Sequence, residues 1–237
     1  MIIFGANPVT EAIRSRADRI RYIAVAKSLG GKLQRLVEEA REAGVAIRFL
    51  DTPQLDRMTN KQVHNGVAAD IAEAALRDLQ AIIADGGEEP VVFILDGIQD
   101  PQNLGAIIRV ADCFGVTAVV VPEHDSASVT GAAVKASAGA TEWVPVCQVT
   151  NLSRTIEELK ADGFWIYGAE AAGDPVSDVD FRGKVVIVLG SEGKGIRRNV
   201  LEHCDRRIAI PMKGHVDSLN VAAAAAVIAY EVQRQRR

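Results

Sequence analysis

The sequence predicts an α/β protein of two domains, a small N-terminal domain and a larger one built on a parallel sheet. The chain has 237 residues, 48% of them hydrophobic, which is enough for one small and one medium domain. After residue 90, short and fully apolar runs alternate with helical patterns, which is typical of a parallel sheet covered on both faces. A segment rich in Ala, Asp, Glu and Gly at residues 72–89 indicates a linker between the two.

The N-terminal domain, residues 1–71, is expected to be a compact α/β unit. Asn7-Pro8 predicts a helix start, because a capping side chain followed by proline is typical of the first helical turn. Residues 32–43 carry apolar side chains at helical spacing, and Gly44 is expected to end this helix. The other predicted elements are strands at 20–25, 46–49 and 66–71 and a short helix at 53–58.

The C-terminal domain, residues 90–237, is expected to hold six strands. They are predicted at 91–95, 118–121, 143–146, 164–167, 185–189 and 208–210. A short amphipathic stretch near residues 76–83 precedes them, and a long helix at about 219–234 follows. The Ala-rich first half of that helix is expected to be buried, in the domain or against a partner subunit. The last residues, 234–237, are expected to be a frayed helix end.

Charge and cysteine content restrict the function classes. The net charge is −4, yet residues 1–71 hold 11 Lys and Arg against 8 Asp and Glu, so a mildly basic unit precedes an acidic one. Such an asymmetry suits RNA binding at one end, although chance gives an excess of three charges equally well. The three cysteines lie far apart, without metal or redox spacing, so no metal is expected. No apolar run approaches the roughly 20 residues of a membrane span, and no export signal is seen, which indicates a cytoplasmic protein.

The ligand site is expected beyond the carboxyl ends of the parallel strands, where such sheets bind their ligands. Unusual residues follow three predicted strands, in the segments 96–109, 189–195 and 210–220. The glycine-rich loop at 190–195 reads G-x-x-G-x-G, the reverse of the dinucleotide fingerprint, and it lacks the spacing of a phosphate-binding P-loop. The loop therefore does not indicate a nucleotide-binding protein of either kind.

Together the three segments resemble the three motifs of the SpoU-type (TrmH-type) RNA 2′-O-ribose methyltransferases of the SPOUT superfamily. Residues 100–115 resemble the first motif with Asn103 and Arg109, residues 189–195 the second with Glu192, and residues 210–221 the third with Ser218 and Asn220. Residues 136–140 and 143–145 are similar to the segment between the first two motifs. One departure is Ala222, where relatives often carry serine. Residues 4–12 and 64–68 resemble, over a shorter stretch, the family's ribosomal-protein-like substrate-binding domain.

The resemblance implies a deep trefoil knot in the C-terminal segment, although knots are otherwise nearly absent from proteins. The knot loops, here about 189–195 and 208–221, are implied to hold S-adenosyl-L-methionine. The residues implied to contact the cofactor, mainly through backbone groups, are Gly190, Ile210 and Leu219, with Leu189 and Met212 as walls. Apolar side chains can enclose an adenine while backbone groups bind its edge. The resemblance also implies a homodimer that packs through the knot and the last helix.

The resemblance nominates Arg109 as the base that removes the ribose proton, which conflicts with the high pKa of arginine. Two interpretations stay open: Arg109 is deprotonated by its neighbours, or it binds a phosphate and orients the nucleotide. Asn103, Ser218 and Asn220 are implied to position ribose, cofactor or Arg109, and Glu192 to orient a partner or the loop backbone. Taken singly, Asn103, Ser218 or Asn220 could equally be a helix cap.

The sequence thus predicts an enzyme that methylates a ribose, with a guanosine of large-subunit rRNA as the expected target. The separate N-terminal domain favours rRNA over tRNA by analogy with relatives. Two alternatives remain, a tRNA or antibiotic-resistance rRNA methyltransferase of the same family and a non-catalytic RNA-binding assembly factor. Basic clusters at residues 14–21, 197–198 and 206–207 could bind RNA phosphates or could be solvated surface charge.

Overall fold

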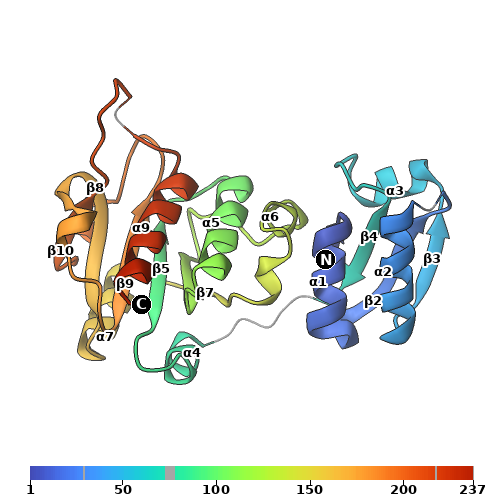
Figure 1. Ribbon diagram of the computed structural model, residues 1–237, viewed down its shortest axis with the longest axis horizontal. Helices are drawn as coiled ribbons and strands as arrows, with labels where there is room; N and C mark the ends of the chain where they lie inside the picture. Colours follow the sequence, from blue (N-terminus) through green and yellow to red (C-terminus); the bar gives the residue numbers. More distant parts are fainter. Residues whose placement is uncertain (29, 73–77, 217, 237) are drawn as a thin grey trace. The chain divides into compact units, whose positions relative to one another are not determined.

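The computed structural model describes residues 1–28, 30–72, 78–216 and 218–236 (Figure 1). Contacts divide the chain into two compact units. Unit 1 comprises Met1–Ala75 and Ser128–Trp143, and unit 2 comprises Leu76–Ala127 and Val144–Arg237. The expected bounds differ from these units in two segments. Residues 128–143 lie within the predicted C-terminal domain yet pack with unit 1, and most of the expected linker, residues 72–89, belongs to unit 2. Residues 76 and 77 of the predicted amphipathic stretch lie outside the described residues; the rest forms α4 (Leu79–Asp85).

Unit 1 holds a four-stranded mixed sheet in the order β1-β4-β2-β3. Strand β4 runs antiparallel to β1 and β2, and β2 runs parallel to β3. The strands are β1 (Ile2–Phe4), β2 (Ile20–Ala26), β3 (Ile47–Leu50) and β4 (Val67–Ile71), and the helices α1 (Ala6–Arg16), α2 (Gly31–Glu42) and α3 (Thr52–Met58). Strand β1 was not predicted, because three apolar residues are too few to display an alternating pattern.

The first helix begins earlier than predicted. Gly5, with φ of 98°, is its N-cap residue, and Asn7 lies inside the helix, where its Oδ1 atom accepts a hydrogen bond of 3.0 Å from Lys32 Nζ. Only glycine adopts that φ without strain, so the chain enters the helix directly from β1. The short helix α3 starts as predicted, because Asp51 and Gln54 form a capping box with Pro53 in the first turn.

Residues 128–143 pack on β1 and α1 of unit 1. They form α6 (Gly131–Ala136) and a 3₁₀ turn, Ala140–Glu142. A side chain at Gly131 would place its Cβ 2.3 Å from the Ile2 carbonyl oxygen, so glycine is required for this close packing. Trp143, predicted to begin a strand, instead ends this segment, and its Nε1 donates to Glu11 Oε2 at 3.1 Å. The strand itself begins at Val146.

Unit 2 holds a six-stranded sheet in the order β10-β8-β9-β5-β6-β7, and every pair of neighbours is parallel. The parallel sheet predicted from the apolar runs is therefore confirmed. The strands are β5 (Val91–Asp96), β6 (Ala118–Pro122), β7 (Val146–Val149), β8 (Trp165–Pro175), β9 (Val185–Gly190) and β10 (Arg206–Ala209). Strand β8 extends well beyond its predicted end because its second half pairs with β10 across a bulge at Arg207/Ile208.

Helices cover both faces of this sheet, as predicted. Helices α5 (Pro101–Cys113) and α9 (Val221–Gln235) pack side by side on one face (Figure 1). On the other face α4, α7 (Leu152–Ala161) and α8 (Arg198–Leu201) enclose a core in which Ile156 and Val200 meet buried valines and isoleucines of β5 and β9. Among the described residues no helix is both long and apolar enough to span a membrane.

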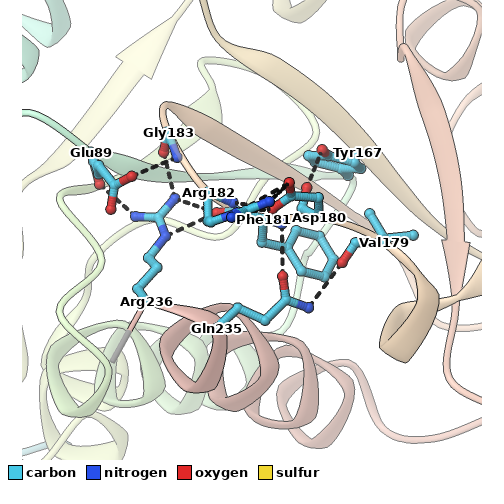
Figure 2. A network of polar contacts seen from close by, with 9 residues as sticks. All are labelled: Glu89, Tyr167, Val179, Asp180, Phe181, Arg182, Gly183, Gln235 and Arg236. Carbon is cyan, nitrogen blue, oxygen red and sulfur yellow. Dashed lines mark hydrogen bonds and ion pairs between the residues drawn. The ribbon is translucent and has the colours of Figure 1, made fainter.

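The last turn of α9 is held by hydrogen bonds (Figure 2), so the prediction of a frayed helix end is wrong for residues 234–236. Arg236 donates to the carbonyl oxygens of Phe181, Gly183 and Glu89, with donor–acceptor distances between 2.5 and 2.9 Å. Gln235 accepts from the Phe181 amide and donates to the Val179 carbonyl, both at 2.9 Å. Burial lowers the pKa of Arg236 from its ordinary value, although a guanidinium stays charged. This C-terminal clasp fixes α9 against the chain that enters β5 and β9.

The path of the chain after β10 matters for the site. Strand β10 lies at one edge of the sheet, whereas α9, which follows it, packs on α5 and β9 near the middle. The segment between them, residues 210–220, must therefore cross the carboxyl ends of several strands. The threading of this segment through a knot, implied by the resemblance, stays a prediction.

Candidate active site

The carboxyl ends of β5 and β9 bring the predicted segments together. Asp96, the last residue of β5, is paired in register with Gly190, the last residue of β9. The chain leaves β5 toward α5, and it leaves β9 into the glycine-rich loop at residues 190–196. The segment 210–220 arrives from β10 and ends at the start of α9, which packs beside α5. Three segments far apart in sequence thus meet at one edge of the sheet, as the sequence predicts.

Three predicted site residues form one hydrogen-bonded cluster at this edge. Asn220 Nδ2 donates to Glu192 Oε1 at 2.6 Å and to Asn103 Oδ1 at 2.9 Å. Asn103 Nδ2 lies 3.5 Å from the same Glu192 oxygen, a much weaker contact. The cluster joins the first turn of α5, the glycine-rich loop and the start of α9. It therefore exists only when all three segments are in place.

Asn220 has two tasks in this cluster. Its Oδ1 accepts the Ala222 amide at 2.9 Å, so the side chain caps α9 while its Nδ2 binds the two other residues. Asn103 is not the cap of its own helix, because Asp100 Oδ1 accepts the Gln102 amide at 2.9 Å and takes that role. Helix capping therefore accounts for part of the role of Asn220 and for none of the role of Asn103.

The glycines of the loop are needed for its tight fold. A Cβ at Gly190 would lie 2.1 Å from the carbonyl carbon of Gly195, so no side chain fits there. Ser191 and Gly195 exchange two backbone hydrogen bonds, of 3.1 and 2.9 Å, which close the loop on itself. Gly193 and Gly195 have φ of 81° and 66°, in the left-handed region that glycine adopts freely. This closure presents Glu192 toward Asn220.

A buried ion pair, not predicted from the sequence, holds both ends of the loop. Asp96 has a fully buried side chain, and its two carboxylate oxygens accept the Arg197 backbone amide and Nε, each at 2.7 Å. Asp96 is paired in the sheet with Gly190, where the loop begins, and Arg197 directly follows the loop. The Asp96 carboxylate therefore fixes the distance between the two ends of the loop. An aspartate at the last position of an otherwise apolar strand was the available signal. Arg197 was considered only as part of a basic surface cluster.

The residues predicted to contact the cofactor differ in exposure. Leu189 is only 1% exposed, so its side chain belongs to the core and only its backbone is available to a ligand. Met212 and Leu219 are 42% and 38% exposed, and Ile210 is half-buried. Exposed or half-buried apolar side chains, in a segment that Asn220 bonds to the closed loop, suit an adenine, which needs apolar faces and backbone partners for its edge. The residues present therefore fit S-adenosylmethionine.

Two predicted residues remain outside the cluster. Arg109 lies on α5 with its side chain exposed, and Ser218 is exposed in the segment before α9. Within the described part of the chain, neither has a hydrogen bond or an ion pair, so both are available to a ligand. The same residues contain no group of His, Cys, Asp or Glu that could hold a metal ion.

The geometry defines a class of protein: a parallel α/β domain with an amide–carboxylate cluster and a closed glycine loop at its carboxyl edge. The pattern of the SpoU rRNA methylase family matches residues 90–230, and that of the RNA 2′-O ribose methyltransferase substrate-binding domain matches residues 2–76. The chain therefore belongs to the SpoU rRNA methylase family.

Individual relatives agree with this assignment. The 23S rRNA (guanosine-2′-O-)-methyltransferase RlmB of Xanthomonas campestris pv. campestris is 42% identical over 239 residues, covering 99% of this chain and 96% of the relative. The SpoU methyltransferase AviRb of Streptomyces viridochromogenes, solved with the cofactor AdoMet, has a TM-score of 0.83 at 27% identity and covers 100% of this chain and 90% of AviRb. The TrmH/SpoU tRNA modifying enzyme of A. aeolicus, at 29% identity and a TM-score of 0.56, covers 66% of this chain and 83% of that enzyme.

Proposed function

We propose that the chain transfers the methyl group of S-adenosylmethionine to the 2′-hydroxyl of a guanosine in 23S rRNA. One observation carries the proposal: Asn103, Glu192 and Asn220, one from each family motif, form a single hydrogen-bonded cluster. A protein that only bound RNA would not need this arrangement, nor the exposed apolar residues Met212 and Leu219 in the segment that leads to Asn220. The similarity to the Xanthomonas guanosine-2′-O-methyltransferase supports the choice of reaction and nucleoside.

When bound, S-adenosylmethionine supplies an electrophilic methyl group on a sulfonium, and no new anion has to be stabilised on transfer. Alignment and water exclusion are therefore expected to provide most of the rate. The cluster supports such alignment, because it joins the glycine-rich loop to the end of the segment 210–220 and fixes their separation. Ser218 is proposed to contact ribose or cofactor, and its exposed side chain without a partner in the described structure supports this role.

Arg109 is assigned to substrate orientation. Its guanidinium is exposed and without a partner among the described residues, so it is free to bind a phosphate next to the target ribose. An arginine side chain normally stays protonated in proteins, which disfavours the role of base.

The choice of rRNA over tRNA rests on unit 1. The Xanthomonas rRNA enzyme matches this chain over 99% of its length, and the substrate-binding pattern covers residues 2–76. The A. aeolicus tRNA enzyme, in contrast, matches only 66% of the chain. We infer that unit 1 binds structured rRNA. The basic cluster at residues 14–21 is expected to contribute less to RNA binding than the sequence suggests. Arg14, Arg19 and Arg21 already form ion pairs with carboxylates within the unit.

We also propose a homodimer that packs through α9. Ala223, Val227 and Tyr230 are exposed at a helical spacing, so they form one apolar stripe along the outer face of α9. Arg109 is exposed on the neighbouring helix α5, so a partner on this stripe would lie near the site. We propose a cytoplasmic location, which the proposed rRNA substrate supports.

The test is incubation with methyl-labelled S-adenosylmethionine and, separately, 23S rRNA or tRNA, followed by mapping of any 2′-O-methyl group. Label on one guanosine of 23S rRNA is the expected result. Arg109→Ala should abolish it, whereas Arg154→Ala, which removes an exposed arginine of α7, should not. Arg109→Lys should retain part of the activity if the role is phosphate binding.

Other results have definite meanings. Label on tRNA alone would contradict the rRNA assignment while leaving the reaction intact. Cofactor binding without label on either RNA would contradict free rRNA as substrate. Absence of cofactor binding would overturn the methyltransferase assignment and favour the non-catalytic assembly factor.

A further inference from the structure

A second pocket lies at the carboxyl edge of the sheet in unit 2, apart from the amide–carboxylate cluster. Its volume is about 190 Å³, and no residue predicted from the sequence as part of the site contributes to it. The lining residues come from the turn after β6, the start of α7 and the chain around α8: Pro122, His124, Asp125, Thr150, Asn151, Leu152, Ser153, Arg197, Asn199 and Val200. A cavity of roughly 150 Å³ can hold a benzene ring, so this pocket has room for one nucleobase.

The pocket is built from fixed parts. Ser126 Oγ donates to the Pro122 carbonyl at 2.5 Å and the Ala127 amide to the Ile98 carbonyl at 2.7 Å, so both ends of the turn that carries Asp125 are tied down. On the other side, Asn151 caps α7 by accepting the Arg154 amide at 3.1 Å. The pocket therefore needs little rearrangement to receive a ligand.

Arg197 connects this pocket to the candidate active site. Its Nε and backbone amide are held by the buried Asp96, which fixes the direction of the guanidinium. In the described structure its two terminal nitrogens have no partner, and the side chain is 49% exposed. Arg197 and Glu192 stand at opposite ends of one closed loop. A ligand on Arg197 is therefore linked by a short, rigid segment to the cluster.

The chemistry of the lining distinguishes between possible ligands. Asp96 neutralises Arg197, and Asp125 adds a carboxylate without a partner in the described structure, so the pocket does not favour an anion. A nucleobase with donors and acceptors on its edges suits the mixture better. Guanine offers N1–H and N2–H donors to a carboxylate and O6 and N7 acceptors to an arginine. His124 adds a ring on which a base can stack.

We propose that this pocket binds a guanine base of the RNA substrate, unstacked from its neighbours, with Asp125 accepting from N1–H and N2–H and Arg197 donating to O6 or N7. Single-stranded bases in loops and bulges are commonly recognised in this way. The proposal rests on the proposed function, because it supplies a specificity site for the guanosine-containing RNA.

The test uses free nucleotides, so that it does not depend on methyl transfer. With S-adenosylhomocysteine filling the cofactor site, guanosine, xanthosine and adenosine 5′-monophosphates are titrated against the full chain by saturation-transfer NMR. The wild-type protein should bind the guanosine nucleotide about tenfold more tightly than the other two. Xanthine has an acceptor oxygen in place of the N2 amino group. Asp125→Asn should therefore reverse the preference between the guanosine and xanthosine nucleotides.

Asp162→Asn is the matched control, since Asp162 is an exposed aspartate at the opposite end of α7. This variant should bind like the wild type. If all three nucleotides bound equally and inorganic phosphate displaced them, the pocket would be a phosphate site and the proposal would be overturned. Unchanged preference in Asp125→Asn, or no binding at all, would overturn it as well.

The two proposals can fail separately. Methylation of 23S rRNA by a protein without guanine preference would refute the pocket alone. Guanine preference that Asp125→Asn reverses, in a protein that methylates no RNA, would refute the proposed function and support the pocket.

Discussion

Replacement of Asp96 by asparagine tests whether the buried ion pair holds the glycine-rich loop in place. The substitution keeps the size of the side chain and removes its charge. One amide oxygen can still accept from Arg197, but the amide nitrogen must face a second donor, either Nε or the backbone N–H. The variant thus loses one charge-assisted hydrogen bond and leaves a buried donor without an acceptor.

The magnitude follows from burial. A hydrogen bond to a charged group contributes about 1.5–3 kcal/mol, and an unsatisfied buried donor costs about 1–3 kcal/mol. The carboxylate is fully buried, whereas Arg197 is 49% exposed and regains water, so the lower part of the combined range applies. We expect a loss of about 3 kcal/mol in the free energy of unfolding. For a domain of this size that corresponds to roughly 6–12 °C in the melting temperature.

Scanning calorimetry measures this loss and can separate the transitions of the two units. Asp174→Asn is the matched control, because Arg206 Nε lies 2.6 Å from Asp174 in an ion pair whose two side chains are 45% and 52% exposed. Such an exposed pair contributes at most about 1 kcal/mol. Asp96→Asn should also lower methyl transfer, since Glu192 loses its fixed position. Equal melting temperatures for the two variants would refute the role assigned to Asp96.

Four further predictions concern other parts of unit 2. Asn220→Asp should keep the cap of α9 but abolish methyl transfer, because two carboxylates would face each other at Glu192. Since the cluster is exposed, the melting temperature of this variant should fall less than that of Asp96→Asn, and calorimetry and the labelling assay separate these effects. Arg236→Ala should destabilise unit 2 by about 3 kcal/mol, measured by calorimetry, since three carbonyl groups lose their donor. Burial raises the pKa of Cys204 to about 11, so iodoacetamide at pH 8 should alkylate the exposed Cys113 first, as read by mass spectrometry. For the same reason the free energy of unfolding should fall as the pH rises from about 9 toward 11, where the Cys204 thiol ionises in the unfolded chain first.

Much of the fold could be predicted because its signals are local. Apolar runs indicated the six parallel strands of unit 2, and the short helix predicted at 53–58 corresponds to α3, Thr52–Met58. Errors occurred where a long-range contact decides the outcome. Gly5 starts α1 because the preceding strand pairs with β4, and residues 128–143 pack on β1, which no local pattern reveals. The end of α9 was predicted to fray because its partners are backbone carbonyls elsewhere in the chain.

The same distinction applies to the site. Asn103, Glu192 and Asn220 were predicted from the family resemblance, which identifies residues without saying what they contact. The structure adds that Asn220 bonds to both of the others. The Asp96–Arg197 pair was missed because each residue alone has an ordinary explanation. An aspartate at a strand end and an arginine after a loop become informative only when their distance is known.

The cluster and the C-terminal clasp, at opposite ends of α9, together explain how a site of exposed side chains can be well ordered. Arg236 fixes one end of the helix to the chain that enters β5 and β9. Asn220 caps the other end and binds the segments that leave those same strands. The helix therefore runs along the sheet from the carboxyl ends of the strands to their amino ends. Its start bonds to the segments that leave β5 and β9, and its end bonds to the segments that enter these two strands. An error in the docking of α9 would displace Asn220 from Glu192, so the cluster forms only when the last segment of the chain has folded correctly. Activity in this protein should consequently depend on the clasp of Gln235 and Arg236, which lies at the opposite end of α9 from the cluster.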